Sequence, residues 1–501
     1  MKGKKTMRLP GLVVSLATVF GTVATGISQA QSGTPDPAFG VLGRVLTTFE
    51  TATDQAFAVA IQPDGKIVAA GFTTFPIANG DNNFAVVRYN PDGSLDPTFG
   101  TGGGVITNFR TDVPTGDPDA PSRNSSDTAR AILIQPDGSS FKIVVGGFSD
   151  APNGDFNFAL VRYNPDGSVD PTFGDNAIFP GTTLTDFRQL PDGTRSLDQL
   201  RALTLEPDGK IVAVGFSNAP NGTDGNFALV RYSPDGIIDP TFGDNAIFPG
   251  TVLTDFGNGS SDDAFAVALH PDGQLVVAGS TSAAPDCQAA FGLVRYNNGV
   301  PNTNFGPNNR VATCLRGTNA QASALVVQAD GRIVAVGTTN GPNGDLNFGL
   351  ARYNLDGTLD PTFNADSINP GLSITDFDNR ALGDGTVERS VDVALAAAMQ
   401  ADGRIVVAGT SNAPLGVDNT NFALVRYDLN GVAITDFGTN NRVLTDLANT
   451  TGDHVLNSST DQAQAIAIQP DGLIVVVGGS DAPIAAVGGP SFNFALVRYL
   501  P

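Results

Sequence analysis

Short apolar segments separated by polar turns repeat along the whole chain. In the first complete unit these segments are Ala56–Ile61, Lys66–Gly71, Phe84–Tyr89 and Val105–Phe109. In the third segment both alternating sets of side chains are largely apolar, which is typical of a strand covered on both faces. A Pro-Asp-Gly turn joins the first two segments, because Pro and Asp favour turns and Gly supplies a positive φ. Each unit is therefore predicted to form four short strands.

The unit recurs seven times along the chain. An Arg-Tyr pair ends the third strand of every unit, and the seven tyrosines of these pairs are all the tyrosines in the protein. The pairs are Arg88-Tyr89, Arg162-Tyr163, Arg231-Tyr232, Arg295-Tyr296, Arg352-Tyr353, Arg426-Tyr427 and Arg498-Tyr499. Seven units of four strands predict an all-β seven-bladed β-propeller of four-stranded blades.

The two ends of the chain complement each other. The last unit stops after its third strand, at Tyr499-Leu-Pro501, whereas an isolated fourth strand stands near the other end, at Gly43 to Phe49. Together they would complete a blade and leave no open sheet edge at the junction. We therefore expect residues 31–501 to form a single propeller domain, closed by an N-terminal strand that completes the last blade.

Residues 1–30 have the layout of a secretory signal peptide. Lys2, Lys4, Lys5 and Arg8 precede an apolar run, and Ser28-Gln29-Ala30 places small residues before an expected cut near Ala30. The run is long and contains two glycines, so an uncleaved membrane anchor is the alternative. After cleavage we expect a monomer without a membrane span, exported to the periplasm, the cell surface or the medium.

The charge balance narrows the range of partners. The formal net charge is −22, which argues against nucleic acid because phosphate binding needs a basic surface. The 59 glycines and 33 prolines suit a turn-rich β protein better than a helical one. Attraction of cations is the more direct expectation from this charge.

Two long phrases recur together in the units. These are Gln-Pro-Asp-Gly-Lys-Ile-Val from Gln62, and Phe-Ala-Val-Val-Arg-Tyr-Asn-Pro-Asp-Gly-Ser-Leu-Asp-Pro-Thr-Phe-Gly from Phe84. This pattern resembles the bacterial delta-60 repeat, a β-propeller repeat family, over essentially all of Asp36 to Pro501. The resemblance implies an exported or surface propeller, and it brings no general catalytic motif with it.

The repeated arginine is expected to be structural. Its predicted partner is the Asp of the Asp-Pro-Thr-Phe corner in the same unit, because a partly buried guanidinium needs a carboxylate that it can hold with two bonds. The predicted ion pairs are Arg88 with Asp96, Arg162 with Asp170, Arg231 with Asp239 and Arg352 with Asp360. Two units carry Asn302 and Ile434 in the Asp position, so Arg295 and Arg426 must bond elsewhere. Arg498 would use Asp36.

Loops before several third strands contain Asn, Gly and Asp. Their aspartates are candidate calcium ligands, because Ca²⁺ prefers oxygen ligands: Asp81, Asp155, Asp224, Asp345 and Asp418. Asn-Gly and Gly-Asp are also favoured in ordinary turns, so turn chemistry is the alternative interpretation. No loop has the full EF-hand pattern.

Catalytic candidates are few, and no catalytic residue is assigned. His270 takes the Gln position of a Pro-Asp-Gly hairpin and is expected to be structural, while His454 lies in a long link without an identifiable partner. Cys287 and Cys314 flank neighbouring antiparallel strands at one rim of a blade. In an exported protein this placement favours a disulfide, with two free buried thiols as the alternative.

The strand order predicts where binding could occur. All long and variable loops, such as Arg110 to Asp127, would lie on one face, and loops on a rigid scaffold usually carry binding. The favoured function is a non-enzymatic exported scaffold that binds a protein or polysaccharide of the cell surface through this acidic face. The alternative is a hydrolase or lyase acting on a carbohydrate or lactone at the central channel mouth, an idea that depends on fold analogy alone.

Overall fold

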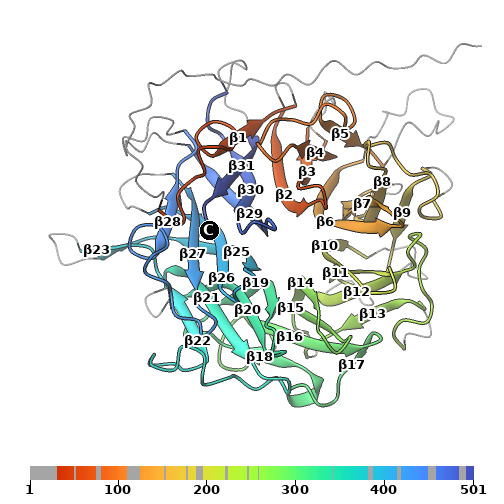
Figure 1. Cartoon of the computed structure of the whole chain (residues 1–501). Coiled ribbons are helices and arrows are strands. Elements are labelled where there is room, and N and C mark those ends of the chain that lie inside the picture. Colours follow the sequence, from red (N-terminus) through yellow and green to blue (C-terminus); the bar gives the residue numbers. More distant parts are fainter. Residues whose placement is uncertain are drawn as a thin grey trace, which may run out of the picture.

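Seven antiparallel sheets form a closed ring (Figure 1). The computed structural model describes residues 31–49, 52–74, 81–109, 125–151, 154–176, 179–187, 196–219, 224–244, 248–257, 259–341, 344–381, 387–413, 419–448, 459–484 and 492–501. Each sheet is one blade, and the blades follow one another around the ring in chain order. The predicted all-β seven-bladed propeller is confirmed.

Each blade runs from an inner strand beside the ring axis to an outer strand at the rim (Figure 1). Blade I consists of β2 (Asp54–Ile61), β3 (Ile67–Thr73), β4 (Asn83–Tyr89) and β5 (Gly104–Thr107). Blade II consists of β6 (Asp127–Asp137), β7 (Ser140–Ser149), β8 (Asn157–Tyr163) and β9 (Thr182–Thr185). Blade III consists of β10 (Asp198–Leu205), β11 (Ile211–Ser217), β12 (Asn226–Tyr232) and β13 (Thr251–Thr254). Blades IV and V are β14 (Asp262–Leu269), β15 (Leu275–Thr281), β16 (Ala290–Asn297) and β18 (Val311–Thr313); and β19 (Ala320–Val327), β20 (Ile333–Asn340), β21 (Leu346–Tyr353) and β22 (Leu372–Thr375). Blades VI and VII are β25 (Asp392–Met399), β26 (Ile405–Ser411), β27 (Asn421–Tyr427) and β28 (Arg442–Thr445); and β29 (Asp461–Ile468), β30 (Ile474–Ser480), β31 (Asn493–Tyr499) and β1 (Arg44–Thr47).

Three small elements lie outside this pattern of four strands per blade. The short strand β17 (Val300–Pro301) pairs with β16, and a 3₁₀ helix at Pro307–Asn309 precedes β18. A separate hairpin, β23 (Asn379–Ala381) and β24 (Val387–Arg389), lies in the link between blades V and VI. None of the helices in the described residues is long and apolar enough to cross a membrane.

The core lies between the blades, because each third strand is covered on both of its faces. All seven residues of β4 are buried. One side contributes Val86 to a cluster with Val145 of blade II, and the other contributes Val87 to a cluster with Val475 of blade VII. Burying one such side chain stabilises the fold by about 1.5–3 kcal/mol, and every blade repeats the arrangement.

The strand pairing defines two faces of the ring. In blade I the inner pair ends at Ile61 opposite Ile67 on one face, whereas Asp54 lies opposite Thr73 on the other. The hairpins and the corners lie on the first face, which we call the hairpin face. The second-to-third strand loops and the links between blades lie on the second, which we call the link face.

The ring is closed by the N-terminal strand. β1 pairs with β31 in blade VII, from Arg44 opposite Val497 to Thr47 opposite Phe494, and the two strands lie side by side in Figure 1. An Asp36 oxygen lies 2.9 Å from Nε and 2.7 Å from Nη2 of Arg498. The N-terminal segment thus supplies both the missing strand and the missing carboxylate of this blade.

Substitution of Asp36 tests this closure. Asp36→Ala leaves the buried Arg498 without its carboxylate, and we expect a loss of about 3–5 kcal/mol in the free energy of unfolding. Asp64→Ala is the control, because Asp64 lies 3.9 Å from Lys66 at the surface and such exposed pairs contribute about 0–1 kcal/mol. Urea unfolding followed by circular dichroism measures both. Equal midpoints for the two variants would contradict a structural role for Asp36.

Candidate functional site

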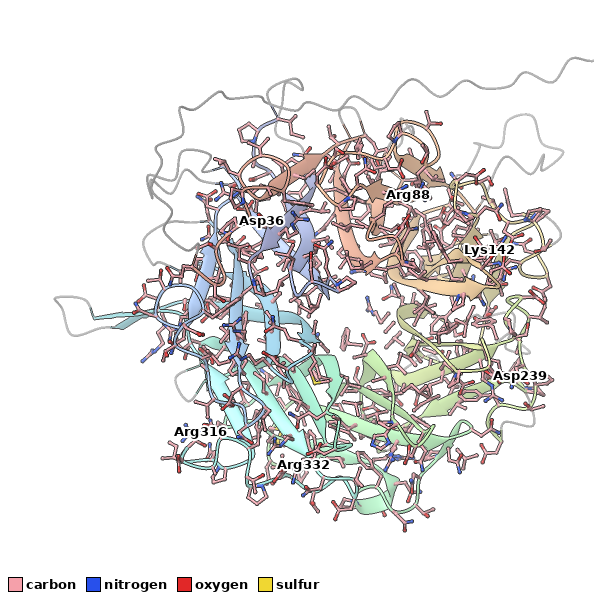
Figure 2. The ribbon with its side chains drawn as sticks, viewed as in Figure 1. Asp36, Arg88, Lys142, Asp239, Arg316 and Arg332 are labelled. Carbon is pink, nitrogen blue, oxygen red and sulfur yellow. A yellow bond between two sulfur atoms is a disulfide. The ribbon has the colours of Figure 1, made fainter. Side chains whose placement is uncertain are left out.

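The four predicted arginine–aspartate pairs form at the blade corners, and Figure 2 labels Arg88 and Asp239 of two of them in the outer part of the ring. The distances from Nε to the carboxylate are 2.7 Å for Arg88–Asp96, 3.0 Å for Arg162–Asp170, 3.0 Å for Arg231–Asp239 and 2.8 Å for Arg352–Asp360. A second cation approaches each of these aspartates, as Lys142 Nζ does at 3.2 Å from Asp170. Burial alone would raise the pKa of Asp170, but hydrogen bonds from Thr172 and the charges of Lys142 and Arg162 lower it to about 2.

The same arginines connect neighbouring blades. Arg162 Nη1 donates to the carbonyl oxygen of Pro234, 2.8 Å away in the next hairpin, and Arg352 donates in the same way to Leu429. Each guanidinium also lies over the phenylalanine of its corner, at 4.8 Å for both Arg162 over Phe173 and Arg352 over Phe363. With their hydrogen-bonding groups engaged in this way, these arginines stabilise the ring and are not candidates for ligand binding.

The two units without a corner aspartate find other carboxylates. Arg295 pairs with Asp272 in its own hairpin, and its Nη2 lies 3.1 Å from Nδ1 of His270. Nε2 of His270 lies 3.0 Å from the carbonyl oxygen of Gly331, so this buried imidazole is part of the blade contact. Arg426 Nη2 lies 3.0 Å from Asp436. His454 lies outside the described residues.

Cys287 and Cys314 form a disulfide, as expected from their placement. It joins the loop before β16 to the residue after β18, with the two Cα atoms 6.0 Å apart. The link that follows Cys314 joins blades IV and V and differs from the other links. Its inner strand starts with Ala320, whereas the other six inner strands start with an aspartate. Here Thr339 Oγ1 donates directly to the carbonyl oxygen of Leu315. The disulfide therefore reinforces the one link that lacks this aspartate.

The six inner-strand aspartates form latches between consecutive blades. These latch aspartates are Asp54, Asp127, Asp198, Asp262, Asp392 and Asp461, and each is fully buried. Asp127 accepts hydrogen bonds from the Phe109 amide at 3.0 Å and from the hydroxyls of Ser125 and Ser149. Burial raises the pKa of Asp127 to about 7, although these hydrogen bonds oppose the shift. The latches are structural groups.

The candidate calcium ligands lie on the link face, each in a different blade. Asp81, Asp155, Asp224 and Asp345 stand just before third strands, and Asp418 lies outside the described residues. The carbonyl oxygens of Asp155 and Asp224 accept hydrogen bonds from Asn157 and Asn226, an ordinary turn contact. Among the described residues no three His, Cys, Asp or Glu side chains gather as a metal site would require. Calcium binding stays a prediction.

A different set of residues combines exposure with variation between the repeats. Every inner strand contains a β-bulge, and the bulged residue is half-buried in all seven blades. We call these residues the bulge ring: Phe57, Arg130, Arg201, Phe265, Ser323, Leu395 and Gln464. Bulges redirect side chains and are frequent next to functional sites. The ring surrounds the propeller axis, because it belongs to the strands nearest that axis (Figure 1).

The backbone around each bulge is repeated, whereas its side chain is not. A glycine of the second strand faces every bulge, and a Cβ at Gly71 would lie 1.8 Å from the carbonyl oxygen of Gln55. The equivalent glycines are Gly147, Gly215, Gly279, Gly337, Gly409 and Gly478. The chain thus builds the same opening in each blade and places a different residue in it. Such a position is suited to a site that breaks the sevenfold symmetry.

Charged side chains in or beside the bulge ring gather on blades II to IV. The Arg130 guanidinium lies 3.9 Å from the Phe57 ring centre, and Arg201 lies 5.5 Å from that of Phe265. Arg201 Nη2 is 3.3 Å from the carboxylate of Asp263. Burial lowers the pKa of Arg130 to about 10, and the nearby Arg201 charge adds to this shift.

Sequence reasoning did not identify the bulge ring, because attention to repeated residues leads away from it. The signal was nonetheless present. In six of the seven inner strands the variable residue lies between two alanines, as in Ala129-Arg130-Ala131, and a glycine recurs in the second strand. Aligning the units and looking for the least repeated half-buried position would have found it.

The latch and corner aspartates together predict a pH optimum of stability. The pKa is raised to about 7 for Asp127 and Asp461 and to about 6 for Asp54, Asp198 and Asp392. A raised folded-state pKa stabilises the fold fully below the unfolded pKa of about 4, and this contribution is lost progressively as pH rises from about 4 to about 6–7. Asp170 and Asp239 have lowered pKa values of about 2, so their contribution is lost as pH falls below about 4. Urea midpoints should therefore be highest near pH 4 and should fall both below this pH and as pH rises towards 7.

The variant Asp127→Asn provides the matched control. It removes one titrating latch, so the fall in stability on the alkaline side should become less steep, whatever its effect on absolute stability. A profile with the same slope as the wild-type protein would show that Asp127 does not titrate in this range.

Loss of the disulfide should lower stability measurably. The bond closes a loop with a sequence separation of 27, for which chain entropy predicts about 3 kcal/mol. Cys314→Ser combined with Cys287→Ser should show this loss in urea unfolding. Treatment of the wild-type protein with a reductant should reproduce it and leave the double variant unchanged. A reductant effect on the double variant would point to another cause.

Six segments of the chain match a family model described as "Domain of unknown function (DUF5122) beta-propeller". They are residues 62–99, 135–173, 206–242, 270–305, 328–363 and 400–433. Each begins at the first hairpin of its unit, which reads Pro-Asp-Gly in the first four and Ala-Asp-Gly in the last two, and the first five end at the corner phenylalanine. A comparison with curated protein sequences gives no match.

Solved structures of low sequence identity also match. A virginiamycin B lyase from Staphylococcus aureus has 12% identity and a TM-score of 0.34, covering 91% of this chain and 98% of its own. An α-L-arabinofuranosidase from Fusarium graminearum has 10% identity and a TM-score of 0.41, with 89% and 93% covered. An α-L-arabinanase from Penicillium chrysogenum has 11% identity and a TM-score of 0.37, with 93% and 96% covered. At this distance the activities of those proteins indicate nothing about this chain. The strand topology shows a seven-bladed propeller, and six segments within it match the DUF5122 β-propeller model.

Proposed function

We propose that the protein is a non-enzymatic binding scaffold that holds a protein or polysaccharide of the cell surface through its link face. The observation that carries this proposal is the unequal division of loops between the two faces. In the described residues the hairpin face receives short repeated turns and corners, whereas the second-to-third strand loops and the blade links leave and re-enter their strands at the link face. Rigid scaffolds usually carry binding on such variable loops.

Three further inferences belong to this proposal. The net charge of −22 favours a partner with basic groups or one bridged by cations such as Ca²⁺. The basic start, the apolar run and Ser28-Gln29-Ala30 support export with cleavage near Ala30, and the disulfide is typical of an oxidising compartment. The two recurring phrases support the assignment of the DUF5122 repeats as delta-60 repeats.

The enzymatic alternative finds less support. A hydrolase or lyase at the mouth of the channel needs groups that exchange protons, commonly two acids or a histidine with its base. The described inner strands carry one carboxylate, Asp263, at the bulge position or two residues before it. The histidine among the described residues, His270, is engaged at the hairpin face.

Charge removal on either face tests the proposal. The link-face variant carries Asp→Asn at Asp81, Asp155 and Asp224, and the matched hairpin-face variant carries Asp→Asn at Asp64, Asp208 and Asp402. Retention of the mature chain on isolated cell envelopes and on their polysaccharide fraction is measured with and without Ca²⁺. We expect the link-face variant to bind about tenfold more weakly than the hairpin-face variant, because only the former removes charge at the proposed interface.

Two outcomes would contradict the proposal. One is equal retention of both variants, and the other is no retention of the wild-type chain on either fraction. Calorimetry with Ca²⁺ alone separates a bridging role from a direct one. Heat and a higher melting temperature would support bridging, and their absence would remove calcium from the proposal.

A further inference from the structure

One arc of the bulge ring carries charges and aromatic rings that the other blades lack. Phe57, Arg130, Arg201 and Phe265 come from four consecutive blades, and neighbouring members of this arc interact with one another. We propose that the arc, together with Asp263, is a binding site for a hydroxy monocarboxylate, such as an acidic sugar. This site lies on the inner strands and does not depend on the function proposed for the link face.

Arg130 supplies the guanidinium for the ligand carboxylate. It packs between Phe57 and Phe148, at 3.9 and 5.7 Å from their ring centres, and forms no hydrogen bond or ion pair among the described residues, although the nearby charge of Asp263, which pairs with Arg201, also acts on it. The third-strand arginines, such as Arg162, each have both. A half-buried guanidinium without an anion is unfavourable, and its planar fork matches a carboxylate with two parallel bonds. The rings of Phe57 and Phe148 thus position the Arg130 guanidinium so that it can bind an anion.

The net charge of the site favours a ligand that carries one negative charge. Arg201 lies 3.3 Å from the Asp263 carboxylate and 2.9 Å from Oε1 of Gln199, so Asp263 balances one of the two guanidiniums. Arg130, Arg201 and Asp263 then carry a net charge of +1, which a monocarboxylate neutralises. A phosphate dianion would leave an excess negative charge in a half-buried position of a chain whose net charge is already −22.

The remaining polar atoms indicate a hydroxyl on the same ligand. Oδ1 of Asp263 is buried and has no hydrogen-bond partner among the described residues, and the same holds for Nε of Arg201. Buried polar atoms are nearly always hydrogen-bonded, so such a pair marks a place where a ligand group can bond. A hydroxyl group can donate to Asp263 and accept from Arg201. Phe57 and Phe265 at the ends of the arc provide apolar contact for the body of the ligand.

Thermal unfolding of the full mature chain with glucuronate tests this site. Glucuronate carries one carboxylate and several hydroxyls, glucose is its neutral counterpart, and inorganic phosphate is the competing anion. We expect glucuronate to raise the melting temperature as its concentration rises to about 10 mM, while glucose and phosphate do so far less. Arg130→Gln should weaken the glucuronate response at least about tenfold, because it removes a charge-assisted pair of hydrogen bonds.

Three variants keep the test independent of folding. Arg404→Gln removes the same charge from an exposed hairpin residue and should retain the full response. Arg130→Lys retains the charge but loses the planar fork, so a folded variant with a reduced response supports the carboxylate geometry. Asp263→Asn raises the local charge and should admit phosphate. The proposal is overturned if Arg130→Gln and Arg404→Gln respond alike, if phosphate stabilises the wild-type chain as well as glucuronate does, or if glucuronate has no effect.

Discussion

The buried arginine at the end of each third strand is the interaction on which the ring depends. In blades I, II and V it binds the corner aspartate of its own blade, stacks on the corner phenylalanine and donates to a hairpin carbonyl of the next blade. A buried guanidinium deprived of its carboxylate destabilises a protein by about 3–5 kcal/mol. The strand, the corner and the neighbouring hairpin are therefore specified together, which explains why these phrases recur as a set.

The exceptions show that the requirement is for a nearby negative charge and not for one particular position. Arg295 reaches Asp272 in its hairpin, and Arg426 reaches Asp436 beyond its corner. Arg498 takes Asp36 from the opposite end of the chain. In each case the arginine remains buried and paired. The repeats thus tolerate a changed corner sequence wherever another carboxylate lies within reach of the guanidinium.

Repeated features could be predicted from the sequence, and individual ones could not. Strand number, closure by the N-terminal segment and the Arg88–Asp96 type of contact follow from residues that recur at fixed offsets. The position of Cys287 and Cys314 on adjacent strands was sufficient for the disulfide. Arg130 and Arg201 are adjacent only because their strands neighbour each other around the ring, and no local pattern marks two bulges as facing. The hairpin of β23 and β24 lacks a repeat counterpart and was not expected.

The pairing of β1 with β31 has a consequence for how the chain is made. Residues 44–47 leave the ribosome about 450 residues before their partners, residues 494–497. Synthesis adds about 5–20 residues per second, so β1 lacks its partner strand for roughly half a minute to a minute and a half. During that time blade I lacks the neighbour that covers Val87, so an apolar face stays open.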